Sequence, residues 1–166
     1  MSSVAVIAMG GTIDKDYIVE SASLEVVDPF IGWIAPQLRM AYRLEVVQLA
    51  DKDSLDLADA DRARLLAHIA NSDRVRLLIT HGTDTLLATA SAVWTAQNAG
   101  EIPADRTIVF TGAFRPGRFV QSEACFNVGF ALAVAQSATP GVYVAVGGQF
   151  APVDHVKHER GHFVYG

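Results

Sequence analysis

The sequence is short of cysteine, of aromatic residues and of long apolar runs. Its 166 residues include one cysteine, Cys125, which excludes an internal disulfide and favours a cytoplasmic location. No apolar stretch approaches the roughly 18 residues that a membrane span requires. The N-terminus also lacks the basic segment of a signal peptide. We therefore expect no association with a membrane.

Basic residues are also few, with 13 lysine and arginine residues against 18 aspartate and glutamate residues and a net charge of −5. They form no cluster, so nucleic acid is not an expected partner. Apolar residues are plentiful at 51%, and charged residues make up 19%, which is a globular composition. The length is enough for one domain with a substantial core, and no linker divides it, so we predict a single domain over residues 1–166.

Apolar runs typical of buried strands alternate with segments of helical character. Strands are predicted at 4–8, 44–49, 74–79, 107–111 and 142–146, and helices at 28–39, 58–72, 86–99 and 121–137. The first helix should be capped by Asp28, and the last should carry Cys125 in the core. Residues 14–27 are predicted to form a long loop or flap, and residues 147–166 a polar tail. The alternation predicts a parallel sheet with helices on both faces.

Polar residues follow three of these strands, at Gly10-Gly11-Thr12, at residues 51–54 and at residues 80–85. In a parallel sheet these segments meet at one edge, where ligands bind near helix N-termini. Residues such as Thr83 and Asp84 are also ordinary helix caps, and that interpretation stays open. The glycines would let backbone N–H groups approach a ligand closely, as in an oxyanion hole.

A threonine hydroxyl is a weak nucleophile that needs an adjacent base or positive charge. For Thr12 the candidates are Tyr17 and Lys157, and a lysine acts as a base only where burial lowers its pKa. Each residue has an alternative without function: a turn residue, a cover for apolar surface and a solvated charge, respectively. The histidines of the tail, His155 among them, have a spacing compatible with zinc binding, but no helix signal accompanies them, so a solvated tail is favoured over a metal site.

Five segments together resemble a known family. They are Gly10-Gly11-Thr12-Ile13, His81-Gly82-Thr83-Asp84-Thr85, Thr111-Gly112-Ala113-Phe114-Arg115-Pro116, Phe126-Asn127 and Asp154-His155-Val156-Lys157. In this order and at this spacing they resemble the signature of the bacterial-type L-asparaginase family. The resemblance implies a flavodoxin-like (Rossmann-like) fold, equivalent to the N-terminal domain of that family. It also implies an amidohydrolase without cofactor or metal that converts L-asparagine to L-aspartate and ammonia through a threonine acyl-enzyme.

The resemblance also implies a role for each matching residue. Thr12 would be the nucleophile and Tyr17, in the flap, would assist it. Thr83 and Lys157 would position or activate the attacking water. Asp84 would bind the α-ammonium group of the substrate, as opposite charges favour.

Three further residues are implied as binding groups. The backbone N–H groups of Gly11 and Thr83 would stabilise the oxyanion. Long family members carry a serine that binds the α-carboxylate, and Asp51 takes its place in our alignment. Because an acid repels a carboxylate, we expect the N–H of Asp51 or the side chain of Lys52 to bind it, unless the true position is shifted by a residue or two.

Family members are usually about twice this length, and their second domain helps to form the active site of a neighbouring subunit. The chain therefore resembles a short, single-domain form or a fragment, and we expect a homo-oligomer, either a dimer or a tetramer. Two alternatives remain. One is an ammonia-releasing glutaminase or amidotransferase-type subunit, which would copurify with a partner. The other is a catalytically inactive amino-acid-binding module, which would release no ammonia.

Overall fold

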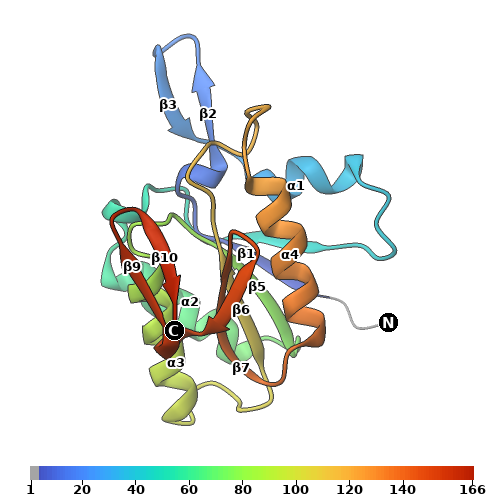
Figure 1. Ribbon diagram of the computed structural model, residues 1–166, viewed down its shortest axis with the longest axis vertical. Helices are drawn as coiled ribbons and strands as arrows, with labels where there is room; N and C mark the ends of the chain where they lie inside the picture. Colours follow the sequence, from blue (N-terminus) through green and yellow to red (C-terminus); the bar gives the residue numbers. More distant parts are fainter. Residues whose placement is uncertain (1–3) are drawn as a thin grey trace.

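The computed structural model describes residues 4–166 and is built on a six-stranded sheet (Figure 1). Its strand order is β4-β1-β5-β6-β7-β8; the first five are parallel to one another, and β8 is antiparallel to β7. The bounds are β1 Ala5–Ala8, β4 Glu45–Gln48, β5 Arg76–Thr80, β6 Thr107–Thr111, β7 Gly141–Val146 and β8 Gln149–Pro152. The predicted α/β fold is confirmed, and residues 1–3 of the predicted domain lie outside the described residues.

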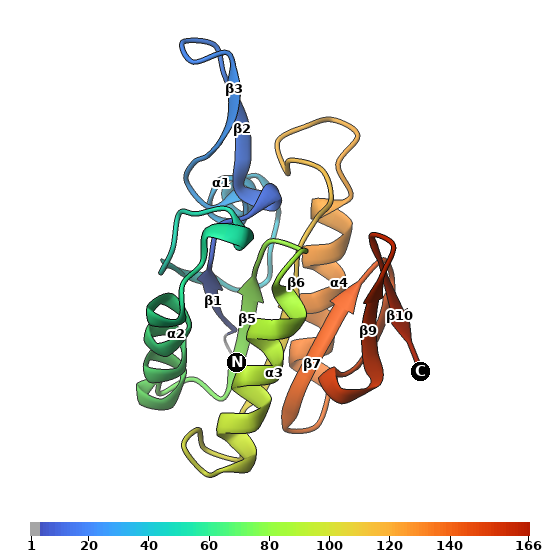
Figure 2. The ribbon, with the colours of Figure 1, turned by 90° about the vertical axis from the view of Figure 1, so that its left-hand side faces the viewer.

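Helices cover both faces of the sheet (Figure 2). They are α1 Phe30–Ile34, α2 Asp59–Asn71, α3 Leu86–Asn98 and α4 Ala124–Ser137. Along β5, Leu77 and Ile79 pack in one core cluster with α2 and α3, whereas Leu78 packs in the other with α1 and α4. Burial on both faces explains why the parallel strands are continuous apolar runs rather than alternating ones.

The segment predicted as a long loop or flap contains a β-hairpin. A 3₁₀ turn, η1 (Thr12–Asp14), leads into β2 (Lys15–Ile18), which pairs antiparallel with β3 (Ser23–Val26). This hairpin, which we call the flap, projects from the body of the molecule (Figure 1). The flap was expected, but its two strands were not, because neither has a buried face and no apolar period marks them.

The predicted polar tail also forms regular structure. After β8 come the turn η4 (Val153–His155) and an antiparallel hairpin of β9 (Val156–Glu159) and β10 (His162–Tyr165). Val156 is buried, and Phe163 and Tyr165 pack against the same core cluster. The Tyr165 hydroxyl lies 3.1 Å from both the N and the O of Val146. The prediction of a polar tail was wrong because the contacts that order this segment are to residues distant in the chain. A local sequence pattern does not record such contacts.

Two smaller predictions were also wrong. The first helix ends early, at Ile34, and a 3₁₀ turn η2 (Ala35–Gln37) follows it. Its first amide, that of Phe30, donates to the side chain of Asp14 at 2.8 Å, so Asp14 takes the place predicted for Asp28. Cys125 is exposed rather than buried. Within residues 4–166, no helix combines the length and apolarity needed to cross a bilayer.

Candidate active site

The carboxyl ends of β1 and β5 meet through two glycines. Gly11 has φ +83°, and a Cβ there would collide with the backbone N and Cα of Gly82. A Cβ on Gly82 would in turn lie 2.6 Å from the Cβ of Ser54. Only glycine allows so close a contact of backbones. As a result, Thr12 and Thr83, each one residue further along, are brought to the same place.

The end of β6 completes this cradle, which we define as Gly11, Gly82 and Gly112 with the residues around them. A Cβ on Gly112 would collide with the carbonyl oxygen of His81 and lie 3.4 Å from Cγ2 of Thr83. Asn127, fully buried on α4, donates from Nδ2 to the Gly112 carbonyl at 2.8 Å. Its Oδ1 accepts the N–H of Gly147 at 3.0 Å. Asn127 thereby ties the ends of β6 and β7 together, a role that the sequence did not reveal.

His81 sets the orientation of the peptide group before Thr83. Burial lowers the pKa of His81 to about 4, so its ring is neutral near pH 7. Since a carbonyl oxygen can only accept, the ring donates from Nδ1 to the carbonyl of Gly82 at 2.8 Å. The N–H of Thr83 lies on the opposite side of the same planar peptide group and so points away from His81. That orientation is compatible with the predicted oxyanion role of Thr83.

The corresponding prediction for Gly11 was wrong. Its N–H donates to the carbonyl oxygen of Lys52 at 2.9 Å, so this donor is already used and is not available to an oxyanion. This hydrogen bond instead holds the loop after β4 against the cradle.

Ser54 is the hydroxyl that the sequence interpretation missed. It is fully buried and lies against Gly82, and its carbonyl accepts the hydroxyl of Thr85 at 2.8 Å. Thr85 occupies the N-cap position of α3, but its side chain makes no capping hydrogen bond. The capping interpretation of this segment therefore fails for Thr85. The signal for Ser54 was its place in the polar cluster after the second predicted strand.

The two residues predicted to bind the α-carboxylate lie further out. Asp51 and Lys52 are both exposed. The Lys52 ammonium is 2.8 Å from Oδ2 of Asp61 on α2, and this contact holds the pKa of the Asp61 carboxyl below its usual range. The charge of Lys52 is therefore already paired. Asp84, predicted to bind the α-ammonium group, is exposed beside the cradle, directly after Thr83.

Tyr17 and Lys157 both lie on hairpins and outside the cradle. Tyr17 is 52% exposed on β2. Lys157 is exposed on the outer face of β9, whereas its neighbours Val156 and His158 face inward, where His158 stacks on Phe163. Within residues 4–166, the side chain of Lys157 forms no hydrogen bond or ion pair, with Thr83 or with any other residue. The structure therefore brings together the backbone segments that carry Thr12, Thr83 and Ser54, whereas Tyr17 and Lys157 lie on the two hairpins.

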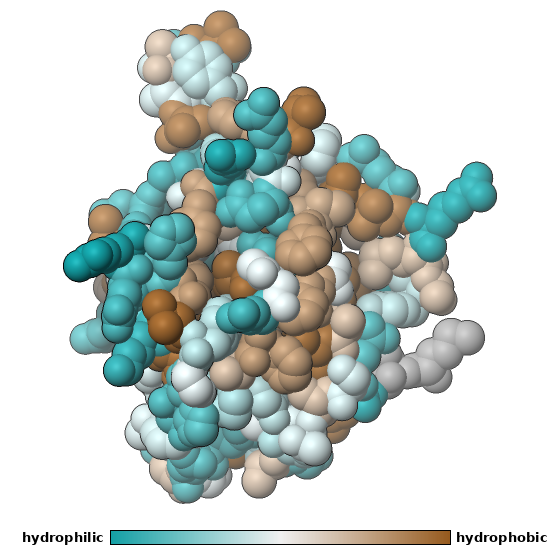
Figure 3. Space-filling view, viewed as in Figure 1, coloured by the Kyte–Doolittle hydropathy of each residue, from teal (hydrophilic) through white to brown (hydrophobic). Residues whose placement is uncertain are grey.

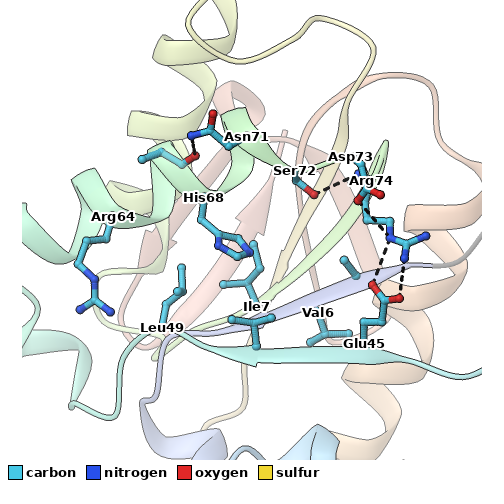
Figure 4. A pocket seen from close by; sticks show the side chains of 13 residues that line it. Val6, Ile7, Glu45, Leu49, Arg64, His68, Asn71, Ser72, Asp73 and Arg74 are labelled. Carbon is cyan, nitrogen blue, oxygen red and sulfur yellow. Dashed lines mark hydrogen bonds and ion pairs between the residues drawn. The ribbon is translucent and has the colours of Figure 1, made fainter.

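A separate groove of about 640 Å³ lies between α2 and the edge strand β4 (Figure 4). The ring of His68 points into it over Ile7, and the ion pair between Arg74 and Glu45 closes one end. Glu45 begins β4, so this end of the groove lies at the amino ends of the strands. Because ligand sites of parallel sheets form at the carboxyl ends, the cradle is the stronger candidate.

Comparison with known proteins decides the family. The model for the family described as "Asparaginase, N-terminal" matches residues 3–160, which is nearly the whole chain. The chain belongs to the asparaginase family. In this chain, the glycine-threonine segments after β1 and β5 lie within the matched residues and build the cradle described above.

Individual relatives agree with this assignment. The "Probable L-asparaginase 4" of Schizosaccharomyces pombe is 31% identical over 149 residues, covering 82% of this chain and 40% of the relative. A "Glutaminase-asparaginase" of Pseudomonas aeruginosa is 29% identical over 145 residues, covering 81% and 38%. The solved thermostable L-asparaginase of Thermococcus kodakarensis superposes with a TM-score of 0.83 at 26% identity, covering 98% of this chain and 51% of that one. The chain thus spans about two fifths to one half of the length of these relatives.

Proposed function

We propose that this chain carries the nucleophile of an L-asparaginase, which hydrolyses the side-chain amide of L-asparagine to L-aspartate and ammonia. The single observation that supports it best is the contact between Gly11 and Gly82. This contact supports the proposal because the residues that follow the two glycines are Thr12 and Thr83, and because the buried Ser54 lies against Gly82. Amide hydrolysis by covalent catalysis needs a nucleophile, an oxyanion site and an anchor for the amino acid, and this arrangement offers each of them.

In the proposed reaction, Oγ1 of Thr12 attacks the side-chain amide carbon, and Tyr17 assists the removal of the hydroxyl proton. The N–H of Thr83 stabilises the oxyanion. The C–N bond then breaks, ammonia leaves with the proton, and an ester to Thr12 remains. Water, positioned by Thr83 and activated by Lys157, attacks that ester. L-Aspartate is released and the hydroxyl of Thr12 is restored.

The amino-acid part of the substrate would be held at both charged ends. Asp84 would bind the α-ammonium group through opposite charge. For the α-carboxylate we favour Ser54 over Asp51 and Lys52. A hydroxyl next to the cradle can donate to a carboxylate, whereas the Asp51 carboxylate repels it and the Lys52 ammonium is paired with Asp61.

An assembly would complete this site, since the hairpins that carry Tyr17 and Lys157 leave both side chains exposed. We expect a cytoplasmic homo-oligomer, a dimer or tetramer, in which another copy covers the open site. An apolar surface over α4 is consistent with burial against a partner (Figure 3). Phe126 on α4 is 61% exposed and Phe150 on β8 is 47% exposed. Sedimentation at micromolar concentration tests this, and a fully active monomer would contradict it.

The test of function is a coupled ammonia assay on L-asparagine and L-glutamine, because one relative is named for both activities. Thr12→Ala should abolish ammonia release while circular dichroism shows an unchanged fold. Lys157→Met should lower kcat more than it weakens binding. Full activity of Thr12→Ala would remove the nucleophile assignment. Binding of L-asparagine without ammonia release by the unmodified protein would favour an amino-acid-binding module instead.

A further inference from the structure

One buried acid joins three elements next to the proposed nucleophile. Asp14, the last residue of η1, is 1% exposed. Its N–H donates to the Gly11 carbonyl at 3.0 Å, and its own carbonyl accepts the N–H of Val27 at 2.9 Å, where the flap returns. Its carboxylate oxygen Oδ1 accepts the first amide of α1, that of Phe30, at 2.8 Å. The turn of Thr12, the neck of the flap and the start of α1 therefore meet at Asp14.

A buried arginine approaches the same place from the loop between β6 and α4. The Arg118 side chain is only 12% exposed, and its Nη2 donates to the Asp28 carbonyl at 2.8 Å. The guanidinium lies 5.5 Å from the ring centroid of Trp33 on α1, and its Nε is 3.9 Å from Oδ2 of Asp16 on the flap. Figures 1 and 2 both show this loop beside the neck of the flap. Arg118 thus bridges the flap and α1.

The same loop is also docked on the nucleophile turn. The N–H of Gly117 donates to the Ile13 carbonyl at 3.0 Å. A Cβ on Gly117 would lie 2.7 Å from that carbonyl oxygen and would collide with the Phe30 ring. A movement of Arg118 would therefore displace the turn that carries Thr12.

The charge of Arg118 acts on Asp14, although no ion pair joins the two side chains within the described residues. Oδ2 of Asp14 and Nη1 of Arg118 are both buried, and neither has a hydrogen-bond partner among the described residues. Burial raises the pKa of Asp14 to about 7, against the opposing effects of the amides of Phe30 and Gly10 and the charge of Arg118. The other charged groups nearby are the carboxylates of Asp16 on the flap and Asp28 before α1. Asp14 is therefore the group here whose charge changes near neutral pH.

We propose that Asp14 and Arg118 are positioning residues for the reaction of Thr12. The buried carboxyl group of Asp14 holds the nucleophile turn and the neck of the flap in place. Because burial raises the pKa of this group, loss of its proton favours a more solvated and looser arrangement of both. The amide of Phe30 and the charge of Arg118 favour the ionised carboxyl but do not outweigh its burial, so the ordered turn favours the protonated form. The inference rests on the proposed function, because its consequence for catalysis requires Thr12 to be the nucleophile.

The activity test compares pH profiles of kcat and kcat/KM for ammonia release. The activity of the unmodified protein should fall by up to about tenfold from about pH 6 to 8, with an apparent pKa near 7. Asp14→Asn should lose this limb, mainly in kcat, and Arg118→Gln should shift it to higher pH, while Arg118→Lys retains it. Asp16→Asn is the matched control, an acid near Arg118 on the exposed flap, and should leave the limb in place. An unchanged limb in Asp14→Asn would overturn the proposal.

A second measurement does not depend on activity. The chain has two tryptophans, so Trp94→Phe leaves Trp33, beside Arg118, as the only fluorescent indole. Its emission should titrate with a midpoint near pH 7, and adding Asp14→Asn or Arg118→Gln should remove or displace that titration. If the Trp94→Phe protein hydrolyses L-asparagine but its Trp33 emission does not change with pH, the role proposed for Asp14 is contradicted. The proposed function is then unaffected. A titrating Trp33 in a protein that releases no ammonia would contradict the proposed function.

Discussion

The cradle and the two hairpins contribute to the candidate site in opposite ways. In the cradle, Gly11 and Gly82 touch through their backbones, and the surrounding strands are buried on both faces. In the hairpins, Tyr17 on β2 and Lys157 on β9 are exposed. The same proposed reaction therefore draws on backbone segments that are packed in the core and on exposed side chains that contribute little to folding.

This difference separates stability from catalysis along the chain. The position of a hydroxyl on the cradle is set by backbone packing and requires no further binding event. The position of an exposed side chain depends on what later covers it, whether a closing flap or a second copy. We therefore expect substitutions in the cradle to change the free energy of unfolding strongly and substitutions on the outer faces of the hairpins to change it little.

The largest expected effect comes from adding one methyl group to the cradle. Gly11→Ala would place a Cβ into the backbone of Gly82 at a residue with φ +83°. We expect a loss of about 5 kcal/mol or failure to fold, which is the exceptional range for one substitution. Gly100→Ala is the matched control, because Gly100 has φ +79° but open space around it, so only the roughly 1–2 kcal/mol backbone term applies. Equal urea midpoints for the two variants would contradict the expectation that backbone packing in the cradle adds to the cost of the substitution.

The next effect is a pH dependence of stability that originates at Asp14. Its pKa is about 7 in the folded protein, raised from 3.8. The folded state therefore binds the proton more tightly, and this contribution is fully present below pH 4 and is lost as pH rises through 7. The change is at most about 4 kcal/mol, since each pKa unit corresponds to about 1.4 kcal/mol. Urea unfolding from pH 4 to 8 should show this decline in the unmodified protein and a flatter curve in Asp14→Asn.

A smaller effect should distinguish Ser54 from Asp51 as the anchor for the α-carboxylate. Ser54→Ala removes a hydrogen bond to a charged group, so the KM for L-asparagine should rise by about 10- to 100-fold, corresponding to roughly 1.5–3 kcal/mol. Asp51→Ala should leave KM within about threefold, because its side chain is exposed and repels the ligand. Initial rates over a range of L-asparagine concentrations measure both. A larger rise for Asp51→Ala would restore the alignment first expected.

The smallest effect on folding is expected at Lys157. Its side chain is exposed and makes no hydrogen bond or ion pair within the described part of the chain. Lys157→Met should therefore change the free energy of unfolding by no more than about 0.5 kcal/mol, as for other surface positions. Urea unfolding checks this, and Val156→Ala, on the buried face of the same strand, is the control that should be destabilised more. A large loss of unfolding free energy in Lys157→Met would mean that the main role of this hairpin is structural rather than catalytic.

Some of this site could be predicted from sequence because its signals are local. The apolar run of β5, the polar segment after it and the start of α3 are continuous in the chain, so Thr83 and Asp84 were placed at the sheet edge correctly. The roles of Ser54 and Asn127 were missed because they depend on contacts with Gly82 and Gly112, which are distant in the chain. The short strands of both hairpins were missed because they have at most one apolar face.

The sequence by itself determined the order of the five parallel strands and of the helices between them, because the burial of each is encoded in its own run of apolar residues. It also determined which residue types reach the carboxyl edge of the sheet, since those residues directly follow the strands. Only the tertiary structure decided which groups meet there: Gly11 with Gly82, Asp14 with Phe30, and Arg118 with Asp28. The physical reason is that backbone contacts and buried charge depend on distances between segments, and no local pattern records those distances.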